Sequence, residues 1–140
     1  MGVESGAQPI TNEDQSIILT VNGEIYNYLK LKKTLKTKHP FRTQSDCEII
    51  LHLYREVGEK LLSQLDGQFA FVLYDRAEDR VIAARDPIGI TTLYYGYNSK
   101  APETLYFASE MKSLNEDCDH VMSFPPGSIY DSKTGQITRW

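Results

Sequence analysis

Three residues with complementary chemistry, Asn22, Gly23 and Glu24, come directly after the apolar run 17–21, which predicts a short buried strand. The side-chain amide of Asn22 can donate a hydrogen bond, and Gly23 lets a ligand oxygen approach its backbone N–H. Together the two donors can form an oxyanion hole, and the carboxylate of Glu24 can receive an ammonium group. By itself, an Asn-Gly pair is more typical of a two-residue hairpin turn that does no chemistry.

A second carboxylate, Asp46, stands just before a stretch with helical periodicity. Ser45 and Glu48 have the spacing of a capping box, and the apolar residues after them predict a helix over 45–57 that Gly58 ends. A carboxylate in the first turn of a helix stabilises the helix dipole by about 0.3–1 kcal/mol. The residues alone therefore favour a structural role for Asp46.

The two cysteines are expected to be ordinary thiols. Each lies between two acidic residues, Cys47 in an Asp-Cys-Glu run and Cys118 in an Asp-Cys-Asp run. Neighbouring carboxylates raise the pKa of a thiol and disfavour the nucleophilic thiolate. The wide separation of the cysteines and the scattered histidines predict no metal site and favour a reduced, cytoplasmic protein.

Composition excludes several classes of function. The chain has 140 residues, of which 41% are apolar, with a net charge of -4 and a pI near 5.3. Its one basic cluster, 30–38, is interpreted as the solvated face of a helix. Outside this cluster the sequence lacks the clustered Lys and Arg of a nucleic-acid-binding protein. No apolar stretch approaches the roughly 18 residues of a membrane-spanning helix, and no Gly-rich loop is present to cradle phosphate. We therefore expect no nucleic acid, no membrane and no cofactor.

The elements that must position these residues show helical patterns first and β patterns later, which predicts an α+β fold with two sheets between helical layers. The predicted helices cover 26–38, 45–57 and 61–65, with a further short helix from 109. The predicted strands cover 17–21, 67–74, 81–85, 93–97 and 105–108, with a closing hairpin around 131–135. Arg85 and Asp86 are interpreted as turn residues that satisfy backbone groups.

Several motifs along the chain carry a resemblance to one family. They are Asn-Gly-Glu-Ile-Tyr-Asn at 22–27, Ser-Asp-Cys-Glu at 45–48, Asp-Gly-Gln-Phe-Ala-Phe at 66–71, Arg-Asp-Pro-Ile-Gly-Ile at 85–90, Tyr-Phe-Ala-Ser-Glu-Met-Lys at 106–112 and Phe-Pro-Pro-Gly at 124–127. From about 2 to 140 the chain resembles the N-terminal glutaminase domain (class II glutamine amidotransferase) of glutamine-hydrolysing asparagine synthetase, and the fungal enzymes most closely. The resemblance implies the four-layer α-β-β-α sandwich of the N-terminal-nucleophile hydrolases, incomplete at its N-terminus.

The resemblance also implies roles for individual residues. Asn22 and Gly23 would form the oxyanion hole, while Glu24 and Asp46 would hold the ammonium group of glutamine. The family's nucleophile is an N-terminal Cys, and an Arg from the same leading segment binds the substrate carboxylate. Both groups are expected upstream of Gly2. ATP and magnesium would belong to a synthetase domain, which is expected to be missing.

We therefore expect residues 1–140 to form a partial amidotransferase domain, truncated at both ends and inactive by itself. The parent reaction would hydrolyse glutamine to glutamate and ammonia, which passes to an ATP-activated aspartate to make asparagine. Whole members of the family are expected to form homodimers. Two alternatives stay open: a non-catalytic glutamine-binding or regulatory module, and a non-functional relic. If the gene model is incomplete, the DNA upstream of Met1 should encode the missing Cys and Arg. A genuine truncation predicts that it does not.

Overall fold

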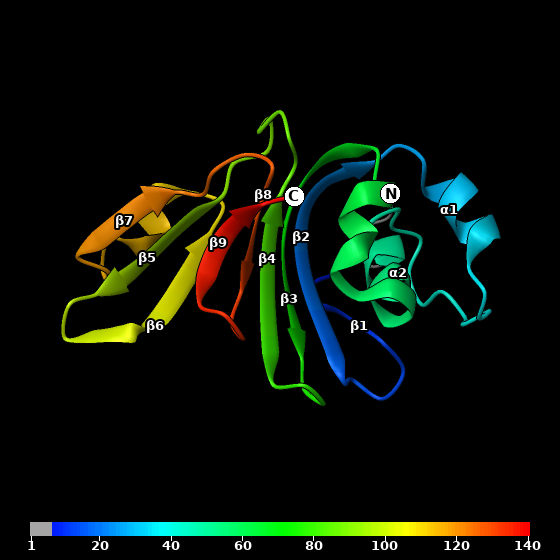
Figure 1. Cartoon of the computed structure of the whole chain (residues 1–140), viewed down its shortest axis with the longest axis horizontal. Coiled ribbons are helices and arrows are strands. Elements are labelled where there is room, and N and C mark those ends of the chain that lie inside the picture. Colours follow the sequence, from blue (N-terminus) through cyan, green and yellow to red (C-terminus); the bar gives the residue numbers. More distant parts are fainter. Residues whose placement is uncertain (1–6) are drawn as a thin grey trace.

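The chain is arranged in layers that lie side by side (Figure 1). The computed structural model describes residues 7–140, so the start of the family resemblance at Gly2 lies outside the described residues. Helices α1 (Tyr28–Thr34) and α2 (Glu48–Val57) form an outer layer, a six-stranded sheet lies in the middle, and a three-stranded sheet follows. This mixture of two sheets and helices confirms the α+β class.

The six-stranded sheet is antiparallel and has the order β1-β2-β3-β4-β8-β9. Its strands are β1 (Ile10–Thr11), β2 (Ile17–Ile25), β3 (Gly67–Asp75), β4 (Arg80–Arg85), β8 (Ser128–Asp131) and β9 (Gln136–Arg139). Strands β2 and β3 pair along their full lengths, from Ile17 opposite Asp75 to Ile25 opposite Gly67. This ladder fixes the faces of all β2 side chains, because a slip of one residue would turn each of them to the other side.

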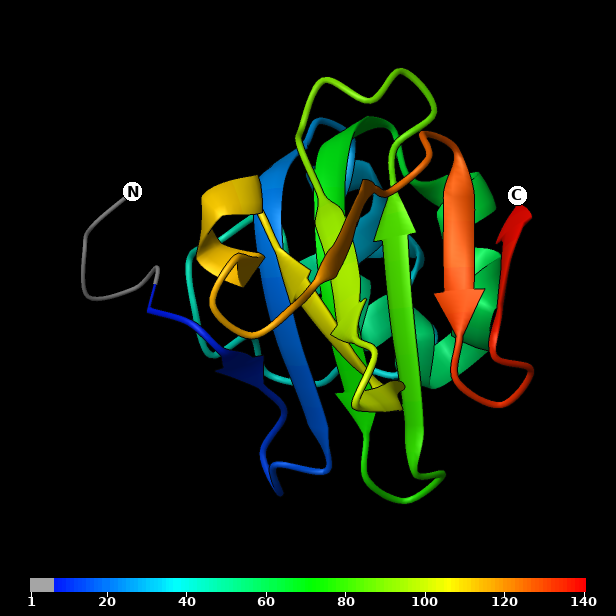
Figure 2. The same cartoon turned by 90° about the vertical axis from the view of Figure 1, so that its left-hand side faces the viewer.

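The three-stranded sheet lies in front of the larger one in Figure 2 and has the order β6-β5-β7. Its strands are β5 (Tyr94–Asn98), β6 (Ala101–Ala108) and β7 (His120–Ser123). The sequence did not predict β7, because three of its four residues are exposed and give no alternating pattern. Of a second helical layer, the described residues contain one short 3-10 helix, η2 (Met111–Leu114), which contacts this sheet.

The helical layer agrees in part with the prediction. Helix α2 ends at Val57, and Gly58, with φ of +61°, donates its N–H to the carbonyl of Tyr54, as expected of a glycine stop. A 3-10 helix, η1 (Gly58–Gln64), follows in place of the predicted helix 61–65 and buries Leu61 and Leu62. Helix α1 is shorter than the predicted helix 26–38, because only Leu31 of its residues is buried and so little packing extends it.

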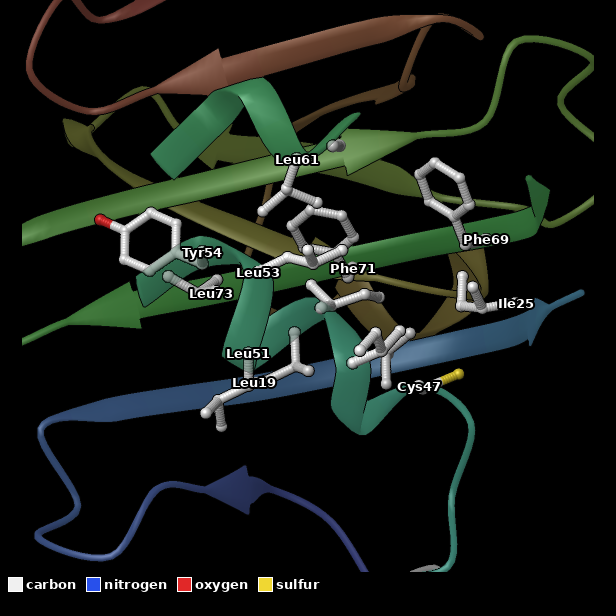
Figure 3. Close-up of a cluster of buried hydrophobic side chains, with 14 of the residues drawn as sticks. Leu19, Ile25, Cys47, Leu51, Leu53, Tyr54, Leu61, Phe69, Phe71 and Leu73 are labelled. Carbon is white, nitrogen blue, oxygen red and sulfur yellow. The ribbon is translucent and has the colours of Figure 1, made fainter. Parts of the chain in front are cut away.

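Two apolar clusters join the layers, and strand β3 contributes to both because its side chains alternate between two faces. Phe69, Phe71 and Leu73 face the helices (Figure 3), whereas Ala70 and Val72 face the smaller sheet. The larger cluster includes the buried residues Leu19, Val21, Ile25, Cys47, Ile49, Leu53, Leu61 and Ile82. The smaller cluster lies between the sheets and includes Ala83, Leu93 and Phe124.

Two buried charged residues, Arg85 and Asp86, hold the turn after β4. The Arg85 guanidinium donates to three backbone carbonyls at 2.7–2.8 Å, those of Gly89, Thr91 and Phe124. The Asp86 carboxylate accepts from three backbone N–H groups, those of Phe69, Ile88 and Gly89. The predicted structural role of this charged pair is confirmed.

Candidate functional site

The Asn-Gly pair lies inside strand β2 and not in a hairpin turn. Strand β2 continues past the predicted strand 17–21 and ends at Ile25, so the hairpin interpretation of Asn22 and Gly23 is wrong. The additional residues 22–25 of β2 pair with β3, which begins at Gly67, directly opposite Ile25. Pairing with β3 therefore overrides the local turn preference of the two residues.

Gly23 fits its position because the neighbouring strand leaves no room for a side chain. Its φ is +130°, a conformation that residues with a Cβ rarely adopt. A Cβ built there would lie 2.0 Å from the backbone carbonyl oxygen of Gln68 and 2.7 Å from the Cα of Phe69. Only glycine allows β2 and β3 to pair in this register, which gives Gly23 a structural role beside its predicted contact with a ligand.

A surface hollow of about 320 Å³ at the end of β2 holds the two acidic residues of the prediction. We call it the terminal hollow; it is lined by Glu24, Ile25, Tyr26, Tyr28, Gln44 and Asp46. Glu24 is exposed and Asp46 is half-buried. None of the described residues that line the hollow is a lysine or an arginine. The hollow therefore presents two carboxylates to solvent with no lining cation to neutralise them.

The backbone of β2 fixes Asp46 in this hollow. Its Oδ2 accepts a hydrogen bond of 2.5 Å from the N–H of Ile25. Within the described part of the chain no hydrogen bond engages its Oδ1. The carboxylate makes no capping hydrogen bond to α2, which begins at Glu48. The observed contact of Asp46 is thus a tertiary one, which leaves one oxygen for a ligand.

A second hollow, of about 330 Å³, contains Asn22. We call it the intersheet hollow, because its lining comes from both sheets and the adjoining loops: Gln8, Thr20, Val21, Asn22, Ala70, Phe71, Val72, Thr92, Leu93, Phe107, Ala108 and Ser109. Asn22 and Glu24 are two residues apart in β2, so their Cα atoms lie about 7 Å apart in an extended strand. The two hollows are therefore neighbours along one strand.

The structure thus brings the four predicted residues to one end of β2 without placing all of them in one hollow. Glu24 and Asp46 share the terminal hollow, and Asn22 lines the intersheet hollow. Gly23 lies between Asn22 and Glu24 in the strand. A ligand that touches all four must extend along β2 from one hollow to the other.

The thiol beside these residues is unsuited to nucleophilic attack. Cys47 is buried next to Ile25 (Figure 3), and its Sγ donates to the carbonyl oxygen of Gly23 at 3.5 Å. Burial raises the pKa of this thiol to about 12, and the charge of Asp46 adds to the effect. Desolvation also raises the pKa of Cys118. Neither thiol is a thiolate at neutral pH, in agreement with the expectation from their acidic neighbours.

Sequence reasoning missed four residues of the terminal hollow: Ile25 and three residues with uncharged polar groups. Gln44, Tyr26 and Tyr28 line it beside the two carboxylates. They lie within or next to the motifs at 22–27 and 45–48. This closeness in the sequence was the one signal that could have marked them as site residues. The tyrosine hydroxyls and the Gln44 amide add uncharged hydrogen-bonding groups to an otherwise acidic site.

The predicted capping box at the start of α2 is wrong. The Ser45 hydroxyl accepts a hydrogen bond from the N–H of Cys47, two residues on, and Glu48 does not reach back to Ser45. The Glu48 carboxylate accepts instead from the N–H groups of Arg42 and Thr43. The helix begins at Glu48 itself, which places this side chain in the first turn where it faces the preceding loop.

Two features are absent from the described part of the chain. No group of three or more His, Cys, Asp or Glu among residues 7–140 could hold a metal ion. No helix within the same range is long and apolar enough to cross a membrane.

Comparison with known proteins gives clear matches. A family model described as a glutamine amidotransferase domain matches residues 1–116. The chain is 58% identical over 140 residues to the probable glutamine-hydrolysing asparagine synthetase of Schizosaccharomyces pombe, and 54% identical over 140 residues to glutamine-hydrolysing asparagine synthetase 1 of Saccharomyces cerevisiae. Both matches include all of this chain but only 25% and 24% of the relatives. The chain therefore spans about a quarter of the length of these curated relatives.

Solved structures show the same layered arrangement. The glutamine phosphoribosylpyrophosphate amidotransferase of B. subtilis, in complex with ADP and GMP, matches with a TM-score of 0.77 and 26% identity, over 99% of this chain and 32% of that one. A structure described as the allosteric regulatory enzyme of purine biosynthesis matches with a TM-score of 0.78 and 26% identity, over 96% of this chain and 31% of its own. The likeness extends over nearly the whole chain and supports the expected fold of the N-terminal-nucleophile type.

Proposed function

The chain belongs to the glutamine amidotransferase domain family, and from this membership we propose that it holds glutamine in the glutaminase part of an asparagine synthetase. The family's name gives the substrate of the domain as glutamine. The curated relatives that are more than half identical to it are named glutamine-hydrolysing asparagine synthetases. That identity extends over the whole chain, which supports the same substrate and the same parent enzyme.

One observation carries the proposal: Glu24 and Asp46, from two distant segments, line the same small hollow. Glutamine at neutral pH carries one ammonium group, and two carboxylates without a neighbouring cation are a strong attraction for it. The amide end of a glutamine bound there can extend along β2 toward Asn22. The Asn22 side chain is then available to donate to the amide oxygen, where negative charge develops when the amide is attacked.

The parent reaction on this proposal is hydrolysis of glutamine to glutamate and ammonia, followed by amidation of an ATP-activated aspartate. The 140 residues supply binding groups for the first step. ATP and magnesium have no part in that step and would act elsewhere in the whole enzyme. A cytoplasmic location and a homodimeric state of the whole enzyme belong to the same proposal.

We further propose that the 140-residue polypeptide binds glutamine without hydrolysing it. Its sequence contains two cysteines, Cys47 and Cys118. The pKa of each is raised, and neither Sγ is placed to attack a ligand in the hollows, because both side chains are buried. Binding without turnover is also what a non-catalytic glutamine-binding module would show, so the two functions share this prediction.

Calorimetry tests the binding directly. We expect L-glutamine to bind, and its deaminated analogue glutaramate to bind about tenfold more weakly or worse, because it lacks the ammonium group. An ammonia-release assay on the same protein is expected to give no product above a blank. Equal affinity for the two compounds would contradict the role of the carboxylates, and ammonia release would contradict the predicted inactivity.

A pair of matched variants locates the ammonium contact. Glu24→Gln removes one charge from the terminal hollow and should weaken glutamine binding without unfolding the chain, because Glu24 is exposed. Glu103→Gln removes one charge from the exposed part of β6, outside both hollows, and should leave binding unchanged. Equal effects of the two variants would show that only the overall charge matters.

A further inference from the structure

Glu48 is a buried carboxylate that holds the loop in front of α2. Its side chain is 1% exposed. Oε1 accepts from the N–H of Arg42 at 2.8 Å, and Oε2 accepts from the N–H of Thr43 at 2.7 Å and from the Thr43 hydroxyl at 2.6 Å. Three donors from two consecutive residues thus converge on one side chain, and none of them comes from its own helix.

Thr43 extends this network of hydrogen bonds along the loop. Its Oγ1, which donates to Glu48, also accepts from the N–H of Ser45 at 3.1 Å. The hydroxyl of Ser45 in turn accepts from the N–H of Cys47 at 3.2 Å. Every second residue from 43 to 47 is therefore anchored by a side-chain hydrogen bond. The two residues between these anchors, Gln44 and Asp46, are the ones that line the terminal hollow.

Glu48 also contacts His52 on its own helix. His52 Nε2 lies 3.1 Å from Oε1 of Glu48, one helical turn along α2, and the ring of Phe41 covers His52 with a centroid distance of 4.3 Å. Burial opposes ionisation of Glu48, but the hydrogen bonds from His52, Thr43 and Arg42 outweigh it and hold the pKa of Glu48 below its ordinary value. At neutral pH the side chain is a carboxylate with both oxygens engaged, which makes it a rigid anchor.

We propose that Glu48 is a positioning residue for the glutamine site, because it fixes the turn that sets Gln44 and Asp46 against the end of β2. The inference rests on the proposed function, since the site it serves is the terminal hollow. Glu48 itself does not line that hollow. The hydrogen bonds of Glu48 to Thr43, and of Thr43 to Ser45, fix the backbone of the loop. The fixed loop in turn holds Asp46 where it accepts the hydrogen bond from Ile25.

The test compares two substitutions on the same helix. Glu48→Gln keeps the size of the side chain but turns one acceptor oxygen into a donor, so an N–H of the loop loses its partner. Glu56→Gln is the control: its Oε1 accepts from the N–H of Thr37 at 2.8 Å, in a loop away from the terminal hollow. With both proteins fully folded, Glu48→Gln should raise the Kd for glutamine about tenfold or more, and Glu56→Gln should change it less than about twofold.

A second readout does not depend on ligand binding. Hydrogen exchange of the Ile25 amide should quicken in Glu48→Gln more than exchange of other β2 amides, because its acceptor Asp46 is no longer held in place. If Glu48→Gln does not fold, Thr43→Val decides, since it removes the hydroxyl that links Glu48 to Ser45 and should show both effects more weakly. An unchanged Kd with unchanged Ile25 exchange in a folded variant would overturn the proposal. If the unaltered chain binds no glutamine, the proposed function fails, and Ile25 exchange still decides the positioning role.

Discussion

The carboxylate of Asp46 accepts a 2.5 Å hydrogen bond from the backbone N–H of Ile25, although the two residues are 21 positions apart in the sequence. This contact joins the segment directly before α2 to the end of β2. It brings the Asn-Gly-Glu motif and the Ser-Asp-Cys-Glu motif, each ambiguous by itself, to one surface. The candidate site exists because of this junction.

Asp46→Asn separates the charge of Asp46 from its hydrogen bond. The asparagine carbonyl can still accept from Ile25, so we expect a loss of less than about 1.5 kcal/mol in the free energy of unfolding. Glutamine affinity should fall about tenfold or more, because one carboxylate that faces the ammonium group is gone. Urea unfolding and calorimetry on the same preparation measure both quantities. Unaltered affinity in a folded variant would exclude Asp46 from the site.

Gly23→Ala should destabilise the chain by about 3 kcal/mol, because a Cβ at φ +130° would overlap the carbonyl of Gln68. Gly135→Ala is the matched control. Gly135 also has a positive φ, of +68°, but a Cβ added there would meet no atom within 4 Å. Its substitution should cost about 1 kcal/mol. Equal losses in urea unfolding would show that backbone conformation alone, and not the closeness of β3, requires glycine at 23.

Alkylation measures the state of Cys47. A pKa of about 12 in place of 9 lowers the thiolate fraction near neutral pH about a thousandfold, and burial slows reagent access further. Iodoacetamide at about pH 8 should therefore label Cys47 only after unfolding, with peptide mass spectrometry as the readout. The same chain in urea supplies the control for complete labelling. Rapid labelling of Cys47 in the folded protein would contradict the burial of the thiol and reopen a nucleophilic role for it.

Acid should destabilise the fold through Glu48. The pKa of Glu48 is lower in the folded state than its ordinary value near 4.5, despite the opposing effect of burial. The unfolded chain therefore takes up protons first, and stability that is present above about pH 4.5 is lost as the pH falls through the folded pKa. Between about pH 6 and about pH 3, Glu48→Gln should lose less unfolding free energy than the unaltered chain. Parallel curves for the two proteins would show that Glu48 does not contribute; Glu103→Gln serves as the surface control.

The fold could be predicted furthest where elements are buried and regular. Helix α2 and strands β3 and β4 appear close to their predicted bounds, because long apolar patterns and a glycine stop define them. Strand β7 gave no signal, since its residues are mostly exposed. The end of β2 was misjudged because Asn-Gly has a strong local preference for turns, and only its partner strand decides the outcome.

The candidate site could be predicted only residue by residue. Family resemblance marked Asn22, Gly23, Glu24 and Asp46, but local patterns contain no information about a hydrogen bond between positions 25 and 46. For the same reason the role of Glu48 was missed: its spacing from Ser45 matched a cap, while its actual partners precede the helix. Contacts between separate segments decide both cases.

The most direct test of the proposed glutamine site is a glutamine titration followed by amide NMR of the ¹⁵N-labelled 140-residue chain. Saturable shifts should be concentrated at residues 22–25 and 44–46, with the Ile25 amide among the largest, because a ligand on Asp46 alters its hydrogen bond. Shifts that are absent, or that cluster away from the end of β2, would contradict the assignment of the glutamine site.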